Sequence, residues 1–171
     1  MGPGLTRTMT AAATAAVLTL GACAMGTDEP TEAELAAELA ARPSIEEATV
    51  AQDEMLTEIR AAIDAAIGPQ NWRREEAVSE SGCRDFPGND GMKRGSDSWI
   101  IDGGVSDQEW DLVEQAVTTV TGEHGFQPPE VILDRPGDHV LMFSRDDGAI
   151  VDLGSSTNLV LGATTGCHPR T

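Results

Sequence analysis

The sequence has little positive charge. Its 171 residues include 11 lysines and arginines against 29 aspartates and glutamates, and Lys93 is the one lysine. The formal net charge at neutral pH is −18. Because nucleic acids and anionic lipid headgroups repel such a surface, we expect neither to bind the protein surface. A surplus of acidic side chains is typical of a solvated surface, and a cationic partner is the alternative explanation.

Motifs for catalysis and cofactor binding are also missing. The three histidines show neither the HExxH pattern nor the i, i+4 spacing of zinc sites. No serine lies in a G-x-S-x-G nucleophile elbow, and no glycine cluster forms a phosphate-binding loop. A catalytic triad assembled from distant segments remains an alternative, because triad residues need to be close in the fold and not in the sequence. We therefore predict no cofactor, no metal site and no catalytic residue, and we expect that the protein is not an enzyme.

Each histidine has a structural interpretation instead. His124 follows a predicted helix, where a cation interacts favourably with the helix dipole. His139 alternates with apolar residues, which places it at the margin of a core, and His168 lies near a loose chain end. The segment Asp146-Asp147-Gly148 resembles a fragment of a calcium loop. It lacks the alternating oxygens and closing glutamate of an EF-hand, so we interpret it as a turn.

Residues 1–22 have the layout of a secretory signal peptide. Arg7 precedes an uncharged stretch rich in alanine, valine and leucine over residues 9–20, and small residues follow. This stretch is shorter than the about 20 residues that a membrane-spanning helix needs. The letters LGAC, ending at Cys23, resemble a bacterial lipobox, in which the cysteine is acylated and becomes the N-terminus. An ordinary signal peptide with an incidental cysteine is the alternative.

These signals divide the chain into three parts. We expect residues 1–22 to be removed, residues 23–30 to form the lipidated cysteine and a polar tether, and residues 31–171 to fold as a single domain. Each buried methylene contributes about 0.8 kcal/mol, so two or more acyl chains on Cys23 anchor the protein stably. The expected location is the extracytoplasmic face of the cell membrane.

The remaining cysteines are Cys83 and Cys167. An exported protein meets an oxidising compartment, so an even pair indicates a disulfide bond. Such a bond would close a loop of about 85 residues and stabilise the fold by roughly 4 to 5 kcal/mol in the chain-entropy treatment. A metal-binding pair and a reactive thiol are the alternatives.

Three capping boxes predict helix starts. Each has a hydroxyl residue followed three positions later by a glutamate, at Thr31, Ser44 and Ser106. The first helix ends before Pro43. The second and third are amphipathic, because apolar residues recur at steps of three and four over residues 45–67 and 110–120. Gln52 breaks the first of these apolar stripes.

Strand patterns fill the rest of the chain. They cover residues 72–78, 98–102, 130–133, 139–143, 149–153 and 159–161. The order of two helices, two strands, one helix and four strands has no βαβ rhythm. We predict an α+β fold, an antiparallel sheet with two main helices packed on one face as a two-layer sandwich. The expected core residues of the strands are Leu141, Phe143, Ile150 and Leu159 or Val160.

The order of the features is informative. After the lipobox come RPSIEEA at the start of the long helix, AAIGPQNW at its end, the cysteine at position 83, VSDQEWDLVEQAV and a final strand region closing on Cys167. This arrangement resembles the LppA-like lipoproteins of mycobacteria and related actinobacteria, over roughly residues 31–167. The resemblance implies an envelope lipoprotein with a disulfide. The family has no assigned biochemical activity, so no catalytic residue carries over.

The leading functional hypothesis is a non-enzymatic lipoprotein that binds an unidentified envelope protein or ligand. A carrier of a lipid or another apolar ligand is the first alternative, and it requires a large apolar cavity. An envelope hydrolase is the second alternative, and it requires a histidine beside a nucleophile in a cleft.

Overall fold

A computed structural model describes residues 29–76, 79–86, 88 and 91–170. The predicted signal peptide and its lipobox, with Cys23, lie outside the described residues.

Three helices begin at the three capping boxes. In each, the N-cap hydroxyl accepts from the N3 amide, and the N3 glutamate accepts in return from the N-cap amide. At the second box, the Ser44 amide donates to the Glu47 carboxylate over 2.9 Å. Gly68, with φ +89°, follows the second helix in a backbone conformation that favours glycine. The helices are α1 Glu32–Ala40, α2 Ile45–Ile67 and α3 Asp107–Glu123.

The main sheet has six antiparallel strands in the order β1-β4-β8-β7-β6-β5. All six predicted strand segments contribute one strand each, although the first is shorter than the pattern that predicted it. The turn at Gly148, with φ +82°, connects two of them, as the sequence predicted. The strands are β1 Arg73–Glu75, β4 Ser98–Asp102, β5 Glu130–Arg135, β6 Asp138–Ser144, β7 Ile150–Ser155 and β8 Asn158–Thr164.

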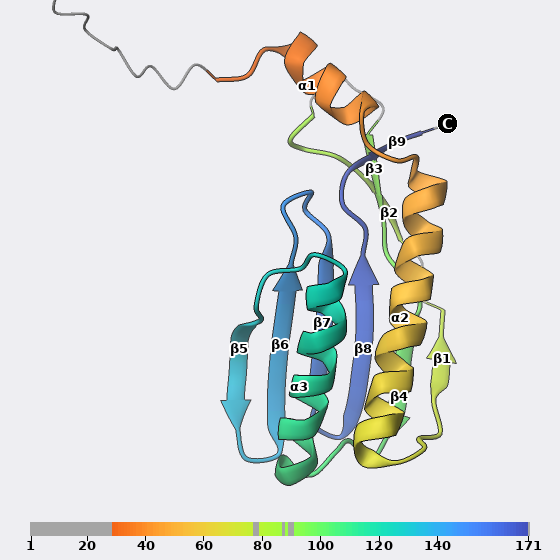
Figure 1. The fold of residues 1–171 in the computed structure, drawn as a ribbon, viewed down its shortest axis with the longest axis vertical. Coiled ribbons are helices and arrows are strands. Elements are labelled where there is room, and N and C mark those ends of the chain that lie inside the picture. The colour runs from red at the N-terminus through yellow and green to blue at the C-terminus, as the bar shows by residue number, and fades with distance from the viewer. Residues whose placement is uncertain (1–28, 77–78, 87, 89–90, 171) are drawn as a thin grey trace, which may run out of the picture.

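α2 and α3 lie side by side on one face of this sheet, so the predicted α+β arrangement is confirmed (Figure 1). The helix stripes and the inward strand residues form one continuous core. Among the expected strand residues, Leu141, Phe143 and Leu159 are buried. Members of this core with no exposed surface include Ile59, Ile63, Val113, Val117, Phe143, Val151, Leu153, Leu159 and Leu161.

One core expectation needs correction, and one pair of alternatives is resolved. Ile150 is half-buried, and Val151 occupies the core in its place. Of the alternatives Leu159 and Val160, Leu159 is the core residue, because it is fully buried whereas Val160 is 38% exposed. Successive residues of a strand point to opposite faces of the sheet, and the apolar letters alone did not tell which of two neighbours faces the helices.

A second sheet, which the sequence patterns did not reveal, has three short strands in the order β2-β3-β9. It lies beyond the end of the main sheet, next to α1 (Figure 1). Its strands are β2 Glu80–Gly82, β3 Gly91–Arg94 and β9 His168–Pro169. They are short and lack apolar alternation, so the periodicity that predicts strands is absent from them.

A disulfide bond joins Cys83 to Cys167 across this second sheet, with a Cα–Cα distance of 5.8 Å. Gly91 passes directly over the bond. A Cβ atom at Gly91 would lie 2.8 Å from the Cys167 sulfur and 2.9 Å from the Cys83 sulfur, so the close approach requires glycine here.

Candidate functional site

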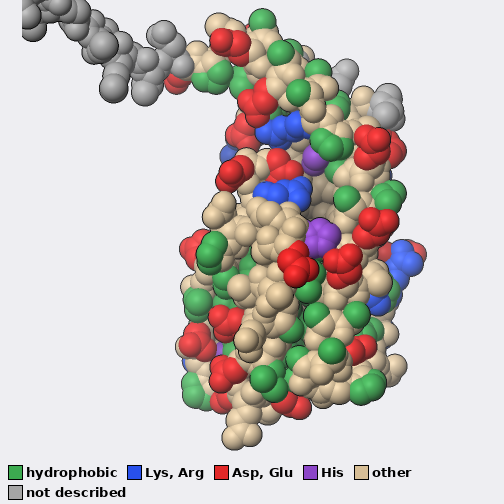
Figure 2. Space-filling model, in the orientation of Figure 1, with side chains coloured by type: hydrophobic (Ala, Val, Ile, Leu, Met, Phe, Trp, Pro, Cys, Tyr) green, Lys and Arg blue, Asp and Glu red, His purple; other side chains and the backbone are tan. Residues whose placement is uncertain are grey.

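A cavity of about 510 Å³ opens between the first half of α2 and the end of the main sheet nearest α1. Its volume lies within the range of about 300 to 1,000 Å³ typical of small-molecule sites. Figure 2 shows arginine, lysine and histidine side chains gathered on this face below α1, with acidic side chains around them. The apolar residues of the cavity wall are Pro43, Ala48, Ala51, Met55, Phe126 and Ala149.

Two buried polar side chains on the cavity wall have an unsatisfied nitrogen. Within the described part of the chain, Nε2 of Gln52 and Nε2 of His168 have no hydrogen-bond partner. Gln52 is 6% exposed and His168 is 4% exposed. Buried polar atoms are nearly always paired, and leaving one unpaired costs about 1 to 3 kcal/mol. Both nitrogens are themselves buried, so they lie behind the surface of the cavity wall.

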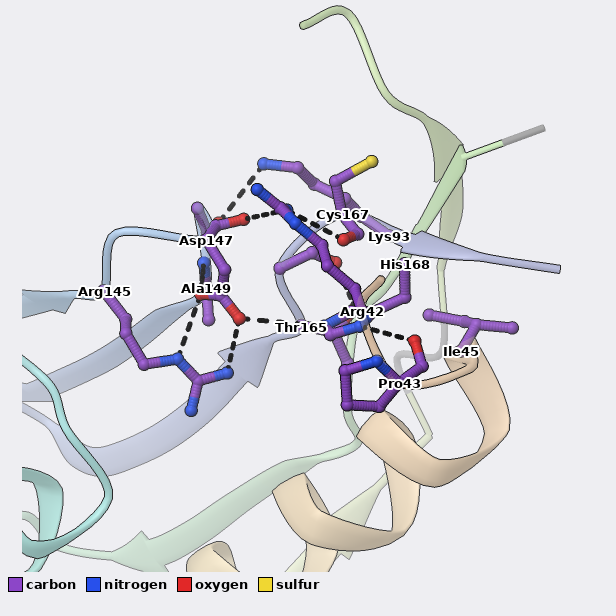
Figure 3. Close-up of polar contacts among 12 residues, drawn as sticks. Arg42, Pro43, Ile45, Lys93, Arg145, Asp147, Ala149, Thr165, Cys167 and His168 are labelled. Atoms are coloured by element: carbon purple, nitrogen blue, oxygen red, sulfur yellow. Dashed lines mark hydrogen bonds and ion pairs between the residues drawn. The ribbon is translucent and has the colours of Figure 1, made fainter. Parts of the chain in front are cut away.

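The ring of His168 lies between a carbonyl and a carboxylate (Figure 3). Its Nδ1 is 3.0 Å from the carbonyl oxygen of Pro43, which can only accept, so Nδ1 carries the proton of the neutral ring. Its Nε2 lies 3.7 Å from Oδ2 of Asp147. Burial has the largest influence on the pKa of His168 and keeps it below the ordinary value, although Pro43 and Asp147 raise it. The neutral ring therefore presents Nε2 as a hydrogen-bond acceptor.

This position corrects the expectation that His168 lies at a loose chain end. The residue is buried in β9, and its ring contacts Pro43, which is distant in sequence. Strand pairing with Met92 fixes its backbone. No local sequence pattern signals a contact of this kind.

Arg145, which lines the cavity, is paired with the Asp147 carboxylate. Arg145 donates to the Asp147 carboxylate from Nε over 3.0 Å and from Nη2 over 2.6 Å. The same carboxylate accepts from the amide of Ala149 over 3.0 Å. Burial alone would raise the pKa of Asp147, but the bonds from Arg145 and Ala149 outweigh it and the pKa is lowered. The guanidinium of Arg145 also lies 5.0 Å from the centre of the Phe126 ring, within cation–π range.

Arg42 ties the α1–α2 connection to this cluster (Figure 3). Its Nη1 donates to the carbonyl oxygens of Asp147 over 3.2 Å and of Cys167 over 2.9 Å. Its Nη2 donates to Glu38 in α1 over 2.7 Å. From the other side, Lys93 Nζ donates to the Gly148 carbonyl over 3.2 Å. One end of the cavity is therefore held by contacts from α1, β3 and the disulfide segment.

His124 lies at the C-cap of α3, as predicted, and lines the cavity. Its Nε2 is 2.7 Å from the carboxylate of Glu58 on α2. The Glu58 side chain is itself 56% exposed. The contact between Glu58 and His124 therefore links the two main helices at the protein surface.

His139 is far from the cavity in the fold, at the opposite end of α3. It is 5% exposed, and its ring stacks on Trp110 with 4.8 Å between centroids. Its Nδ1 lies 2.8 Å from Asp134 and its Nε2 lies 3.1 Å from Asp107. It joins the start of α3 to the β5–β6 hairpin and so has a structural setting.

The pH dependence of the free energy of unfolding should reflect the contacts of His139 with Asp107 and Asp134. Burial lowers the pKa of His139, but the hydrogen bonds to Asp107 and Asp134 outweigh it, so the pKa is raised above 6.5. The stabilisation is complete below pH 6.5 and is lost as the pH rises through the folded-state pKa. We expect the stability difference between wild type and His139→Asn, measured by urea unfolding, to be larger at pH 5.5 than at pH 8.5. An equal difference at both would contradict this assignment.

The unsatisfied amide of Gln52 predicts an unusual stability effect. Gln52→Leu removes a buried polar group without a partner and restores the apolar stripe of α2, so it should raise the free energy of unfolding by about 1 to 3 kcal/mol. Gln108→Leu, on the exposed surface of α3, is the matched control and should change it by about 0.5 kcal/mol or less. Urea unfolding measures both. A destabilised Gln52→Leu protein would show that the amide supports the fold.

Several kinds of site are not formed by the described residues. Over residues 29–76, 79–86, 88 and 91–170, no three histidine, cysteine or acidic side chains are grouped to hold a metal ion. Nor do any serine or cysteine side chains in these ranges hydrogen-bond to a histidine. In the same ranges, the helices are all too short or too polar to cross a membrane.

Fold and site together define a class: a disulfide-linked α+β sandwich with a ligand-sized cavity at one end of its main sheet. The chain belongs to the LppA family, a "lipoprotein confined to pathogenic Mycobacterium", whose family model matches residues 24–170. The resemblance expected from the sequence is thus confirmed. No curated protein matches the chain.

Two solved structures are similar. The crystal structure of LppA from Mycobacterium tuberculosis has a TM-score of 0.66 and 13% identity, covering 81% of this chain and 87% of that one. A DUF4853 family protein from Actinomyces odontolyticus has a TM-score of 0.57 and 16% identity, covering 78% of this chain and 73% of that one. At such identities the similarity shows the fold alone.

Proposed function

We propose that this LppA-family protein is a non-catalytic binding module, held on the extracytoplasmic face of the cell membrane by lipid on Cys23. The cavity beside α2 is its binding site. The observation that carries the proposal is the cavity itself, which has a volume of about 510 Å³ and is lined by both apolar and polar side chains. A cavity of this size can enclose a small molecule, and its mixed wall offers it both apolar contact and hydrogen-bonding groups.

The cavity favours binding over catalysis. The hydroxyl of Thr165 accepts from the Arg94 amide and donates to the Gly166 carbonyl, both over 2.9 Å, so it is engaged in backbone bonds. The histidines of the described wall, His124 and His168, contact a carboxylate and a carbonyl. Among the described residues of the wall, no histidine is hydrogen-bonded to a hydroxyl or thiol, so the activated nucleophile that a hydrolase needs has no support here.

The cavity also favours a small ligand over the acyl chains of a lipid. A purely apolar occupant would take water away from the polar side chains of the wall, which include Glu47, His124 and Arg145, at a cost in free energy. The carrier alternative therefore has less support than binding of a molecule with polar groups.

Native mass spectrometry of the mature lipoprotein, extracted from its own envelope in mild detergent, tests the binding function. We expect a small-molecule adduct that is released on denaturation. Ala48→Phe, which places a ring in the cavity, should lose the adduct. Ala65→Phe, on the exposed face of the same helix, should retain it. Absence of an adduct from the wild-type protein, or its retention by Ala48→Phe, contradicts the proposal.

The anchor has its own test. Because the lipobox-like segment ends at Cys23, Cys23→Ala should abolish acylation and either release the protein into the medium or leave an unprocessed precursor. Detergent-phase partitioning of the wild type and the variant measures the difference. If the variant partitions into detergent as the wild type does, lipid on Cys23 is not the anchor.

A further inference from the structure

We infer that the cavity takes an organic cation, a protonated amine carried on an apolar body. The inference rests on the proposed binding function and adds the chemical class of the ligand. Two properties of the cavity carry it. Among the described residues of the wall, the carboxylate of Glu47 is the one charged group without an ion-pair partner, and the surface around it is apolar.

The Glu47 carboxylate is held in a fixed position by the capping box of α2. Its Oε2 accepts from the Ser44 amide over 2.9 Å and from the Ser44 hydroxyl over 3.1 Å. These two bonds, the one from the amide first, lower the pKa of Glu47, so the exposed side chain is charged at neutral pH. Its Oε1 forms no hydrogen bond with the described residues, so it can accept a charge-assisted bond from an ammonium group.

The other titratable groups of the wall add no positive charge. Arg145 donates to the Asp147 carboxylate over 2.6 Å, so its charge is neutralised. Nε2 of His124 lies 2.7 Å from the Glu58 carboxylate, and protonation of the ring would only neutralise that carboxylate. Burial lowers the pKa of His168, so its ring is neutral. The cavity is therefore negatively charged.

The approach to the cavity is acidic as well. A shallow depression on α2 shares Glu47 with the cavity and is also lined by Glu46 and Glu54. Figure 2 shows further acidic side chains around this face. Arg42 and Lys93, which are not on the wall, donate to backbone carbonyl oxygens. Together with the net charge of −18, this rim attracts cations and repels anions.

The apolar part of the wall selects an organic cation over a metal ion. Ala48 and Ala51 follow Glu47 on α2, and Ala51, four positions on, lies on the same side of the helix. Met55 and Phe126 are 4% and 8% exposed and also reach the cavity. An apolar body in contact with these side chains stays within reach of the carboxylate. The described residues offer no group of three ligands for a metal ion.

Calorimetric titration of the mature lipoprotein in phosphatidylcholine nanodiscs tests the class, with empty nanodiscs as the blank. The three probes share one skeleton: phenylbutylamine is the cation, phenylbutanol is its neutral analogue and phenylbutyrate is the anion. We expect saturable binding of the amine. The alcohol should bind about three- to fivefold more weakly, as loss of a partly exposed ion pair predicts, and the butyrate should bind more weakly still.

Two matched variants locate the charge that matters. Glu47→Gln keeps the capping box, which accepts either residue at N3, and removes the charge. It should weaken binding of the amine about three- to fivefold and leave the affinity for the alcohol unchanged. Glu109→Gln makes the same change in the capping box of α3, at the end of that helix far from the cavity, and should leave both affinities unchanged.

The outcomes separate this inference from the proposed function. Failure of the amine to bind, or equal affinity of Glu47→Gln and wild type for the amine, overturns the ligand class. Equal losses for the amine and the alcohol in Glu47→Gln also overturn it, since the charge would then play no part. Tighter binding of the alcohol or the butyrate, lost in Ala48→Phe, overturns the class but leaves the binding function standing. The proposed function fails separately, in the mass measurement, if the protein carries no adduct.

Discussion

Replacing Cys83 and Cys167 together by serine should lower the free energy of unfolding by roughly 4 to 5 kcal/mol, the largest single effect that we expect. The bond spans a sequence separation of 84, so its loss releases a long loop in the unfolded chain. It also frees the second sheet, whose strands pair over only two or three residues each. Urea unfolding of the oxidised wild type and of the double variant measures the loss.

Reduction provides the matched control for this experiment. Wild type treated with dithiothreitol should unfold at the same urea concentration as the double serine variant, because both lack the crosslink. Peptide mapping without reductant should yield one crosslinked peptide containing both cysteines. Two alkylatable thiols in the native protein, or an unchanged unfolding midpoint in the variant, would refute the bond.

Ile59→Ala should lower the free energy of unfolding by about 2 to 5 kcal/mol. The variant loses the transfer free energy of the deleted atoms, and the cavity that they leave adds a further cost. Ile59 has no exposed surface and lies in the core formed by α2, α3 and the inward strand residues. The helices on the sheet are too closely packed to fill such a void without distortion.

Glu54→Ala on the exposed face of α2 is the control for Ile59→Ala and should change stability by about 0.5 kcal/mol or less. Glu58 would be a poor control, since its carboxylate pairs with His124. Denaturant unfolding of the wild type, Ile59→Ala and Glu54→Ala measures the three free energies of unfolding. Equal stability of Ile59→Ala and Glu54→Ala would mean that the apolar stripe does not face a core.

The helices were predictable because their signals are local. A capping box occupies four consecutive residues, and a stripe such as that of residues 45–67 repeats within one turn of the helix. The longer strands, such as Asp138–Ser144, alternate visibly between buried and half-buried positions for the same reason. The correct order of these elements then sufficed to predict a sheet with helices on one face.

The second sheet depends on non-local interactions and escaped prediction. β9 has two residues and pairs with β3, from a distant part of the sequence, beside a disulfide that constrains both. His168 was misjudged for the same reason, since its environment is made by Pro43 and Asp147. A short strand near a chain end has no periodicity from which to infer burial.

The cavity left one trace in the sequence. Gln52 interrupts an otherwise apolar helix stripe, and a polar residue at such a position either has a buried partner or faces a site. Choosing between these required the structure, which shows its amide nitrogen without a partner. Nothing in the sequence indicated that His168 would share the same cavity wall.

The contacts of Arg42 give the fold a mechanical property. Any tension applied to the chain upstream of α1 passes through Glu38 and Arg42 before it reaches α2. The guanidinium of Arg42 donates hydrogen bonds to the carbonyls of Asp147 and Cys167, and Cys167 is crosslinked to Cys83. The load therefore spreads into a covalently closed loop instead of peeling α2 away from the sheet. These contacts lie between the N-terminal side of α1 and the cavity, so a pull on that side meets them before it reaches the cavity wall.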